Sequence, residues 1–250
     1  VGSEMCIRDS INPALEASFR SQIDILRIIS RSDLVIRLAD LERQLKELQA
    51  MPPPLVAVTD LISQGKLVKA EKLCKAFMQK NPRHIEGMRL LADIGMRLGV
   101  LEDAEFLLES AVEFSPSSTK ARMDYIQVLR KQQKYHEALS HAKVLIQQDP
   151  KNPQFQSVFA VESMQSGDYD TALATFDSIL EILPEEPVTL TSRGNALKTQ
   201  GNKEQAIDSY RRAIKQYPAH GEAYYSLANL KLFSFTDKEI EAMESQEHNP

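Results

Sequence analysis

A proline and an alanine each recur along this chain at an interval of 34 residues, and this period constrains the fold more than any other feature. The positions concerned are Pro82, Pro116, Pro150, Pro184 and Pro218, with Ala70, Ala104, Ala138, Ala172 and Ala206. Such a period is typical of a helical hairpin, in which the small residue lets two helices approach and the proline ends the second helix. We therefore predict an all-α fold, a right-handed α-solenoid in which each hairpin packs only on its neighbours.

The period also divides the chain into regions. The predicted array covers 51–234, with complete units at 51–84, 85–118, 119–152, 153–186 and 187–220 and a partial unit at 221–234. In the fifth unit Leu190, Gly194, Leu197, Gly201, Ala206, Tyr210, Ala213 and Pro218 resemble the pattern of a tetratricopeptide (TPR) repeat. The resemblance implies two short helices per unit, and we expect the alanines of the period to be buried between them.

Two regions precede the array. Residues 1–10 read as a translated adapter tract that is foreign to the protein, so the true N-terminus is unknown. Residues 11–50 are predicted to be a helical extension, which the prolines after Met51 end. Leucines at heptad spacing between 34 and 48 leave two interpretations open: a helix that lies against the first unit, or a helix pair that mediates self-association.

Two details of the units carry further predictions. A glycine follows the first helix in four units, as Gly65, Gly99, Gly167 and Gly201, but the third unit has Gln133 there, so its turn must avoid a positive φ or tolerate strain. In the sixth unit we predict a helix over 222–232 with Ala228 in the small position. A new helix then begins at a Thr236–Glu239 capping box, and 235–250 is the start of a following, truncated region.

Composition excludes several function classes. The net charge of −5 and pI near 5.6 argue against a nucleic-acid partner. Two cysteines permit no disulfide framework, and no apolar run is long enough for a membrane span, so we expect a cytoplasmic protein. The net charge alternates along the units as +4, −5, +4, −7 and +4. This alternation either fixes the register of the stack or reflects ordinary solvated helix faces.

The sequence offers no catalytic, metal-binding or cofactor-binding residues. It contains no glycine-rich phosphate loop, and His136 and His141 have a spacing that places them on different helix faces. In a TPR frame the first helix of each unit lines a concave groove that binds a protein or peptide partner. The residues predicted to line it are Arg89, Arg97, Gln127, Arg130, Lys131, Asn195, Lys198, Tyr225 and Asn229.

A more specific resemblance lies at the end of the array. The run Gly221-Glu222-Ala223-Tyr224-Tyr225-Ser226-Leu227-Ala228-Asn229-Leu230-Lys231, followed by Phe233-Ser234-Phe235-Thr236-Asp237, resembles the junction in bacterial TPR-sulfotransferases. This resemblance implies a catalytic domain beyond residue 250 that takes sulfate from the donor PAPS. No donor-binding residue can be carried over onto this chain, so we expect the 250 residues to transfer no sulfate.

Two functions therefore remain open from the sequence. The first is a scaffold that recruits a protein or peptide for a sulfotransferase whose catalytic domain is missing from this chain. The second is a free-standing TPR adaptor that assembles other proteins.

Overall fold

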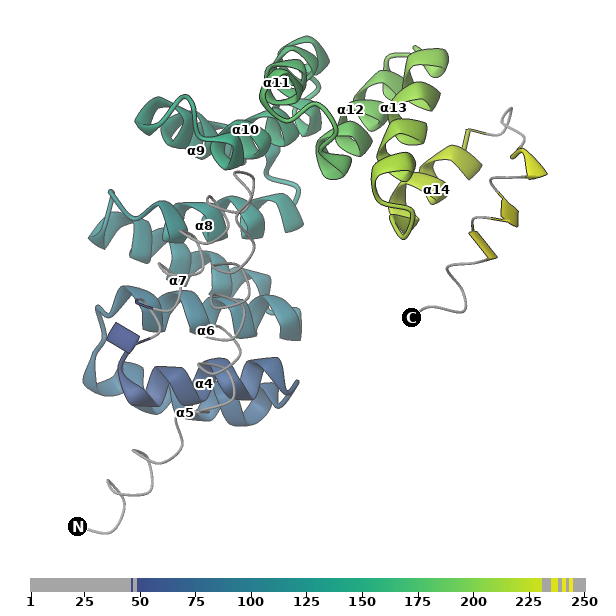
Figure 1. The fold of residues 1–250 in the computed structure, drawn as a ribbon. Helices are drawn as coiled ribbons and strands as arrows, with labels where there is room; N and C mark the ends of the chain where they lie inside the picture. The colour runs from purple at the N-terminus through teal and green to yellow at the C-terminus, as the bar shows by residue number, and fades with distance from the viewer. Residues whose placement is uncertain (1–45, 47–48, 231–234, 238–239, 242, 245–250) are drawn as a thin grey trace. The chain divides into compact units, whose positions relative to one another are not determined.

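The computed structural model describes residues 46, 49–230, 235–237, 240–241 and 243–244, and no strand occurs among them (Figure 1). The predicted coiled-coil leucines of 34–48 lie outside these residues. The described helices are α4 (Pro53–Ser63), α5 (Leu67–Lys80), α6 (Ile85–Leu98), α7 (Leu101–Phe114), α8 (Thr119–Lys131), α9 (Tyr135–Gln148), α10 (Pro153–Gln165), α11 (Tyr169–Ile182), α12 (Pro187–Thr199), α13 (Lys203–Gln216) and α14 (Gly221–Ala228).

The helices repeat with the period of the sequence. The second helix of each hairpin has 14 residues, and these helices begin 34 residues apart, at Leu67, Leu101, Tyr135, Tyr169 and Lys203. Proline is the first residue of three of the first helices, α4, α10 and α12. The N–H at this position has no acceptor within the helix, so its absence in proline costs no hydrogen bond. The predicted all-α solenoid of helical hairpins is confirmed.

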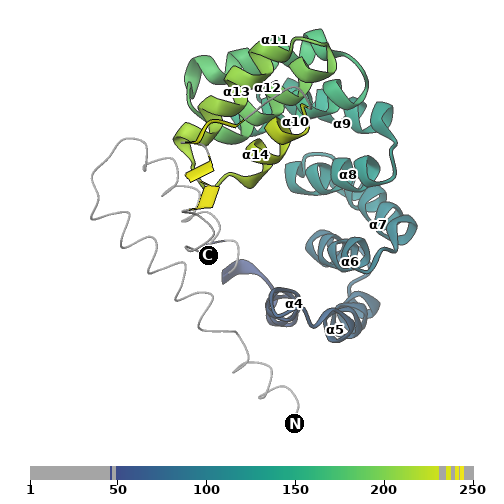
Figure 2. The same cartoon turned by 90° about the vertical axis from the view of Figure 1, so that its right-hand side faces the viewer.

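The chain forms two compact units, unit 1 up to Val128 and unit 2 from Leu129. In unit 1 the first helices α4 and α6 contact each other, and the second helices α5 and α7 form a layer next to them (Figure 2). In unit 2 the first helices α10, α12 and α14 contact one another in succession, and the second helices pack beside them. Each unit is therefore two layers of helices, one of first helices and one of second helices.

The alanines of the period lie at the centre of each hairpin. Ala70, Ala104, Ala138, Ala172 and Ala206 have no exposed surface, which confirms the packing role predicted from the period. The buried apolar residues around these alanines form separate clusters along the array. Leu55 and Ile94 belong to the first cluster, and Tyr210 and Leu227 belong to the last.

A second pair of buried positions is matched in size across the hairpin. In the fifth unit Gly194, in the middle of α12, lies against the ring of Tyr210. In the second and fourth units the equivalent positions hold a small residue on the first helix and a large residue on the second. In the first unit both residues are of intermediate size. These pairs, all buried, are Val58 with Cys74, Ala92 with Leu108, and Ala160 with Phe176.

The turn between the two helices of a hairpin requires a left-handed residue. Glycine supplies it at Gly65, Gly99, Gly167 and Gly201, with φ between 70° and 87°. In the third unit Gln133 adopts the same conformation at φ 62°, so this turn tolerates strain and does not avoid the positive φ. A residue with a Cβ pays about 1–2 kcal/mol for that conformation.

Replacing Gln133 by glycine should stabilise the protein by about 0.5–1 kcal/mol. The relief of strain exceeds the entropy that glycine loses on folding, about 0.5–1 kcal/mol. Urea unfolding measures the gain. The control is Gln147→Gly at an exposed helical position in α9, which should cost about 1 kcal/mol because glycine is a poor helix former. A loss of stability in both variants would contradict the strain at Gln133.

The sixth unit departs from its prediction. The helix over 222–232 is instead α14, which ends at Ala228, and Asn229 and Leu230 form a turn. Ala228 is exposed, although its equivalents are buried, because in the preceding hairpins the second helix covers this position. Helical geometry returns at Asp237, directly after Thr236, and the Glu239 of the predicted capping box lies outside the described residues.

Candidate functional site

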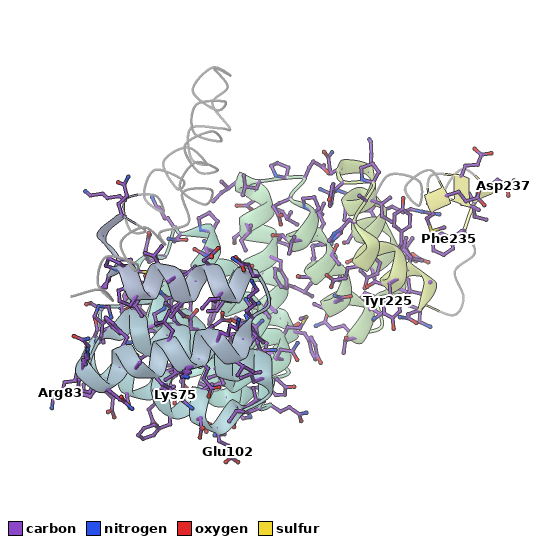
Figure 3. All side chains as sticks on the ribbon, turned by 90° about the horizontal axis from the view of Figure 1, so that it is seen from below. Lys75, Arg83, Glu102, Tyr225, Phe235 and Asp237 are labelled. Atoms are coloured by element: carbon purple, nitrogen blue, oxygen red, sulfur yellow. The ribbon has the colours of Figure 1, made fainter. Side chains whose placement is uncertain are left out.

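Four predicted groove residues lie on two neighbouring first helices of unit 2. Asn195 and Lys198 are one turn apart on α12, and Tyr225 of α14 lies one turn before Asn229, the capping residue directly after that helix. Because α12 and α14 contact each other, these four residues form one surface, which we call the α12–α14 face. Tyr225, labelled in Figure 3, is 70% exposed. Asn229 is exposed and Lys198 is half-buried, so three of the four can meet a partner.

Asn195 has a different role within that face. Its Oδ1 accepts hydrogen bonds from the Tyr210 hydroxyl at 2.8 Å and from the Ser226 hydroxyl at 3.4 Å. Both donors are buried, and burial raises the pKa of Tyr210 to about 12. Asn195 therefore joins α12 to α13 and α14, and its oxygen is committed to the array itself.

Arg130 is also committed to a partner within unit 2. Its Nε donates to Oε1 of Glu162 at 2.7 Å, and Nη2 donates to the same oxygen. The Glu162 side chain has no exposed surface, and its Oε2 has no hydrogen-bond partner among the described residues. Burial raises the pKa of Glu162 and Arg130 opposes that rise. The charge of Arg130 therefore compensates the buried carboxylate of Glu162. Lys131, the next predicted groove residue, is exposed.

The remaining predicted residues, Arg89, Arg97 and Gln127, belong to unit 1. Arg89 donates to Glu86 and to Asp124, both at 2.7 Å, and so ties α6 to α8. Arg97 is bonded to Asp93 one turn earlier, and Gln127 is exposed. Two of the three are therefore paired within the unit, which leaves less cationic surface there than the sequence suggests.

Sequence reasoning missed Glu162 and Ser226. Glu162 is the single charged residue of α10, in the run PQFQSVFAVESMQ, and this isolation is the signal that could have identified it as a buried acid. Ser226 carries no such signal, because a serine in a short helix is common on a solvated face.

The described residues contain no group of side chains that could hold a metal ion, and none of their helices is long and apolar enough to cross a membrane. Cys74 is buried and donates weakly to the carbonyl of Gly87 at 3.4 Å. Burial raises the pKa of its thiol to about 11, so it carries little thiolate at neutral pH.

Comparison with known families gives two matches. Residues 74–189 match the model of the cytochrome c-type biogenesis protein H TPR domain, and residues 191–230 match a tetratricopeptide repeat model. Among curated proteins, human tetratricopeptide repeat protein 6 is 29% identical over 48% of this chain and 23% of its own length. Cytochrome c-type biogenesis protein CcmH of Escherichia coli is 26% identical over 43% of this chain and 31% of its own. The chain thus spans less than a third of the length of these relatives.

Solved structures with the same fold are more distant in sequence. A thermophilic TPR protein of Thermus thermophilus superposes with a TM-score of 0.59 at 19% identity, over 72% of this chain and 98% of that one. YrrB, described as a TPR protein with an unusual peptide-binding site, gives a TM-score of 0.56 at 17% identity, over 74% of this chain and 96% of that one. At such identities the likeness shows the fold alone.

Proposed function

We propose that this chain, a tetratricopeptide-repeat protein, binds an extended segment of another protein on the α12–α14 face of unit 2. The observation that carries the proposal is the exposure of Tyr225 on α14 and of Asn229 directly after it, together with the half-buried Lys198 on the contacting helix α12. A tyrosine that is 70% exposed offers apolar area with little entropy to lose, which is why tyrosine is frequent in binding hot spots.

The chemistry of the face suits a peptide backbone and an acidic or polar side chain. The Asn229 amide can both donate to and accept from a peptide bond. Lys198 supplies a cation on the contacting helix α12, whereas the charge of Arg130 is paired with Glu162. YrrB, one of the structures with this fold, is described as having a peptide-binding site, which supports a peptide as the ligand class for this chain.

A peptide library tests the proposal. Unstructured peptides of about ten residues, displayed on phage, are selected on the whole chain, and selected peptides are then labelled for fluorescence anisotropy. Tyr225→Ala and Asn229→Ala should each weaken binding about tenfold or more, as expected for hot-spot residues. Tyr217→Ala is the matched control, because Tyr217 is 54% exposed but follows α13, and it should leave the affinity unchanged.

Asn195→Ala is unsuitable for this test. Removing the amide leaves the buried Tyr210 hydroxyl without its acceptor, so a change in affinity would be mixed with a loss of stability. Failure to select any peptide, or equal weakening by Tyr217→Ala, would refute the assignment of the face.

Two functions are candidates for the whole protein to which this scaffold belongs. The match to the cytochrome c-type biogenesis TPR domain supports an adaptor that assembles other proteins. The resemblance of the run from Gly221 to Asp237 to bacterial TPR-sulfotransferases supports a recruiting arm for sulfate transfer from PAPS. Reading the next stretch of codons beyond residue 250 separates them, since a glycine-rich donor loop there favours the enzyme and a stop codon favours the adaptor.

A further inference from the structure

The second helices α5 and α7, which lie in the same layer of unit 1, carry opposite charge. The exposed cations of α5 are Lys69, Lys72, Lys75 and Lys80, and the exposed acids of α7 are Glu102, Asp103, Glu109 and Glu113. Residues 34 apart occupy equivalent positions in the two hairpins, and there the charge is inverted, as in Lys69 with Asp103 and Lys75 with Glu109. Lys75 on α5 and Glu102 on α7 are labelled in Figure 3.

An apolar cavity of about 290 Å³ opens between these helices. Residues of α6 and of the turn after it line the cavity, with Glu71 and Lys75 of α5 on one wall and Asp103 and Phe106 of α7 on the other. Phe106 is 68% exposed, and Leu98 and Val100, also in the lining, are 41% and 45% exposed. A large aromatic side chain thus stands exposed beside a cavity, between one basic and one acidic helix.

This surface is complementary to itself. A two-fold axis that runs along the cavity, parallel to α5 and α7, would place α5 of one copy over α7 of the other, and the reverse pair follows from the symmetry. Each basic helix would then face an acidic helix, and equivalent positions of opposite charge would come together. The cavities of the two copies would then face each other across the axis, and Phe106, on the wall of each cavity, would lie beside the cavity of the other copy.

We propose that the exposed surface of α5 and α7 around this cavity, the α5–α7 face, binds a second copy of this chain. The two copies would form a two-fold dimer in which Phe106 of each enters the cavity of the other. A different partner would have to carry the same bipolar arrangement, whereas a second copy carries it by necessity. This surface is distinct from the predicted self-association of 34–48 and from the α12–α14 face of unit 2.

The size of the face sets the strength of the dimer. A 14-residue helix is about 21 Å long, and two helices lying side by side cover about 20 Å in the other direction. Two such faces cover about 800 Å², which is below the range of about 1,200–2,000 Å² for stable interfaces and within that of weak, transient ones, so we expect a concentration-dependent dimer in the micromolar range. Because surface charges contribute, salt above about 0.15 M should shift it toward monomer.

Charge reversal tests the proposal with the full chain. One variant carries Lys69→Glu and Lys72→Glu on α5, and the second carries Glu102→Lys and Glu109→Lys on α7. All four side chains are exposed, so both variants should keep the helix content and melting temperature of the wild type. Lys75 is left in place because it is bonded to Glu71 at 2.6 Å.

Sedimentation equilibrium gives the readout. Wild type should dimerise, each variant alone should dissociate at least tenfold more easily, and an equimolar mixture of the two should form a heterodimer as tight as the wild-type dimer. Phe106→Ser should also dissociate at least tenfold more easily. A wild type that stays monomeric at about 100 μM in low salt, variants that still dimerise alone, or a mixture without heterodimer would each overturn the proposal.

Discussion

Arg130→Ala should lower the free energy of unfolding by about 3 kcal/mol. The substitution removes the cation that is bonded to the Glu162 carboxylate, which has no exposed surface, and an unpaired buried charge of this kind costs about 3–5 kcal/mol. We expect the lower end of that range, because the Arg130 side chain is 37% exposed and part of the pair's attraction is screened by water. Urea unfolding at pH 7.5 measures the loss.

The loss should depend on pH in a defined direction. The pKa of Glu162 is raised in the folded state, and without Arg130 the rise must be larger, since Arg130 opposes it. Between the unfolded pKa, about 4.3, and the raised folded pKa, the folded state binds a proton that the unfolded state has released. Stability therefore falls as pH rises through this window, and the penalty of Arg130→Ala should shrink as pH falls toward about 4.5.

Two further variants isolate the buried pair. Lys131→Ala removes the next cation along the chain, which is exposed, and should change stability by no more than about 0.5 kcal/mol. Adding Glu162→Gln to Arg130→Ala removes the buried charge and should recover part of the loss. A cost for Arg130→Ala that is equal at pH 4.5 and pH 7.5 would show that Glu162 is not the origin of the effect.

Gly194→Ala should cost about 3 kcal/mol, although alanine is the better helix former. A Cβ at Gly194 would lie 2.5 Å from the ring of Tyr210, which is fully buried and held at its hydroxyl by Asn195. Neither the ring nor the helix backbone can yield cheaply, so the site is overpacked. The expected cost exceeds the gain of about 1 kcal/mol in helix propensity. Thermal and urea unfolding measure the difference.

The matched control is Gly221→Ala at the start of α14, where a Cβ would meet no atom within 4 Å. That variant should be neutral or slightly more stable. Combining Gly194→Ala with Tyr210→Leu copies the pair of Ala92 and Leu108 from the second unit, and the two changes together should cost less than the sum of each alone. Strict additivity would mean that Gly194 and Tyr210 do not constrain each other.

The fold could be predicted because its signal is repeated. Each hairpin must place a small residue where its helices cross, so the interval between Ala172 and Ala206 recurs through the chain and sets the helix frame. The end of α14 could not be predicted in the same way. The pattern of α14 continues past Ala228, but a helix of this length depends on a covering neighbour more than on its own propensity.

The site was less accessible to sequence reasoning, because exposure depends on partners that are distant in the sequence. Arg130 and Asn195 stand at positions that a TPR frame assigns to the groove, but Glu162 lies 32 residues after Arg130 and Ser226 lies 31 after Asn195. Each partner is in the adjacent hairpin, where a period alone does not specify the side chain. Tyr225 and Asn229 were predicted for the groove and are exposed; whether they bind a ligand stays a prediction.

The size-matched pairs make the whole hairpin the smallest part that can be exchanged within the array. A first helix with glycine, such as α12, accepts the ring of Tyr210, whereas one with Val58 is matched to the small Cys74. Recombination that joins α4 to α13 would therefore set Val58 against Tyr210 and produce a clash, and the reverse exchange would set Gly194 against Cys74 and leave a void. Shuffling that cuts after the closing proline keeps each pair intact, so new arrays of this kind can grow by copying entire hairpins.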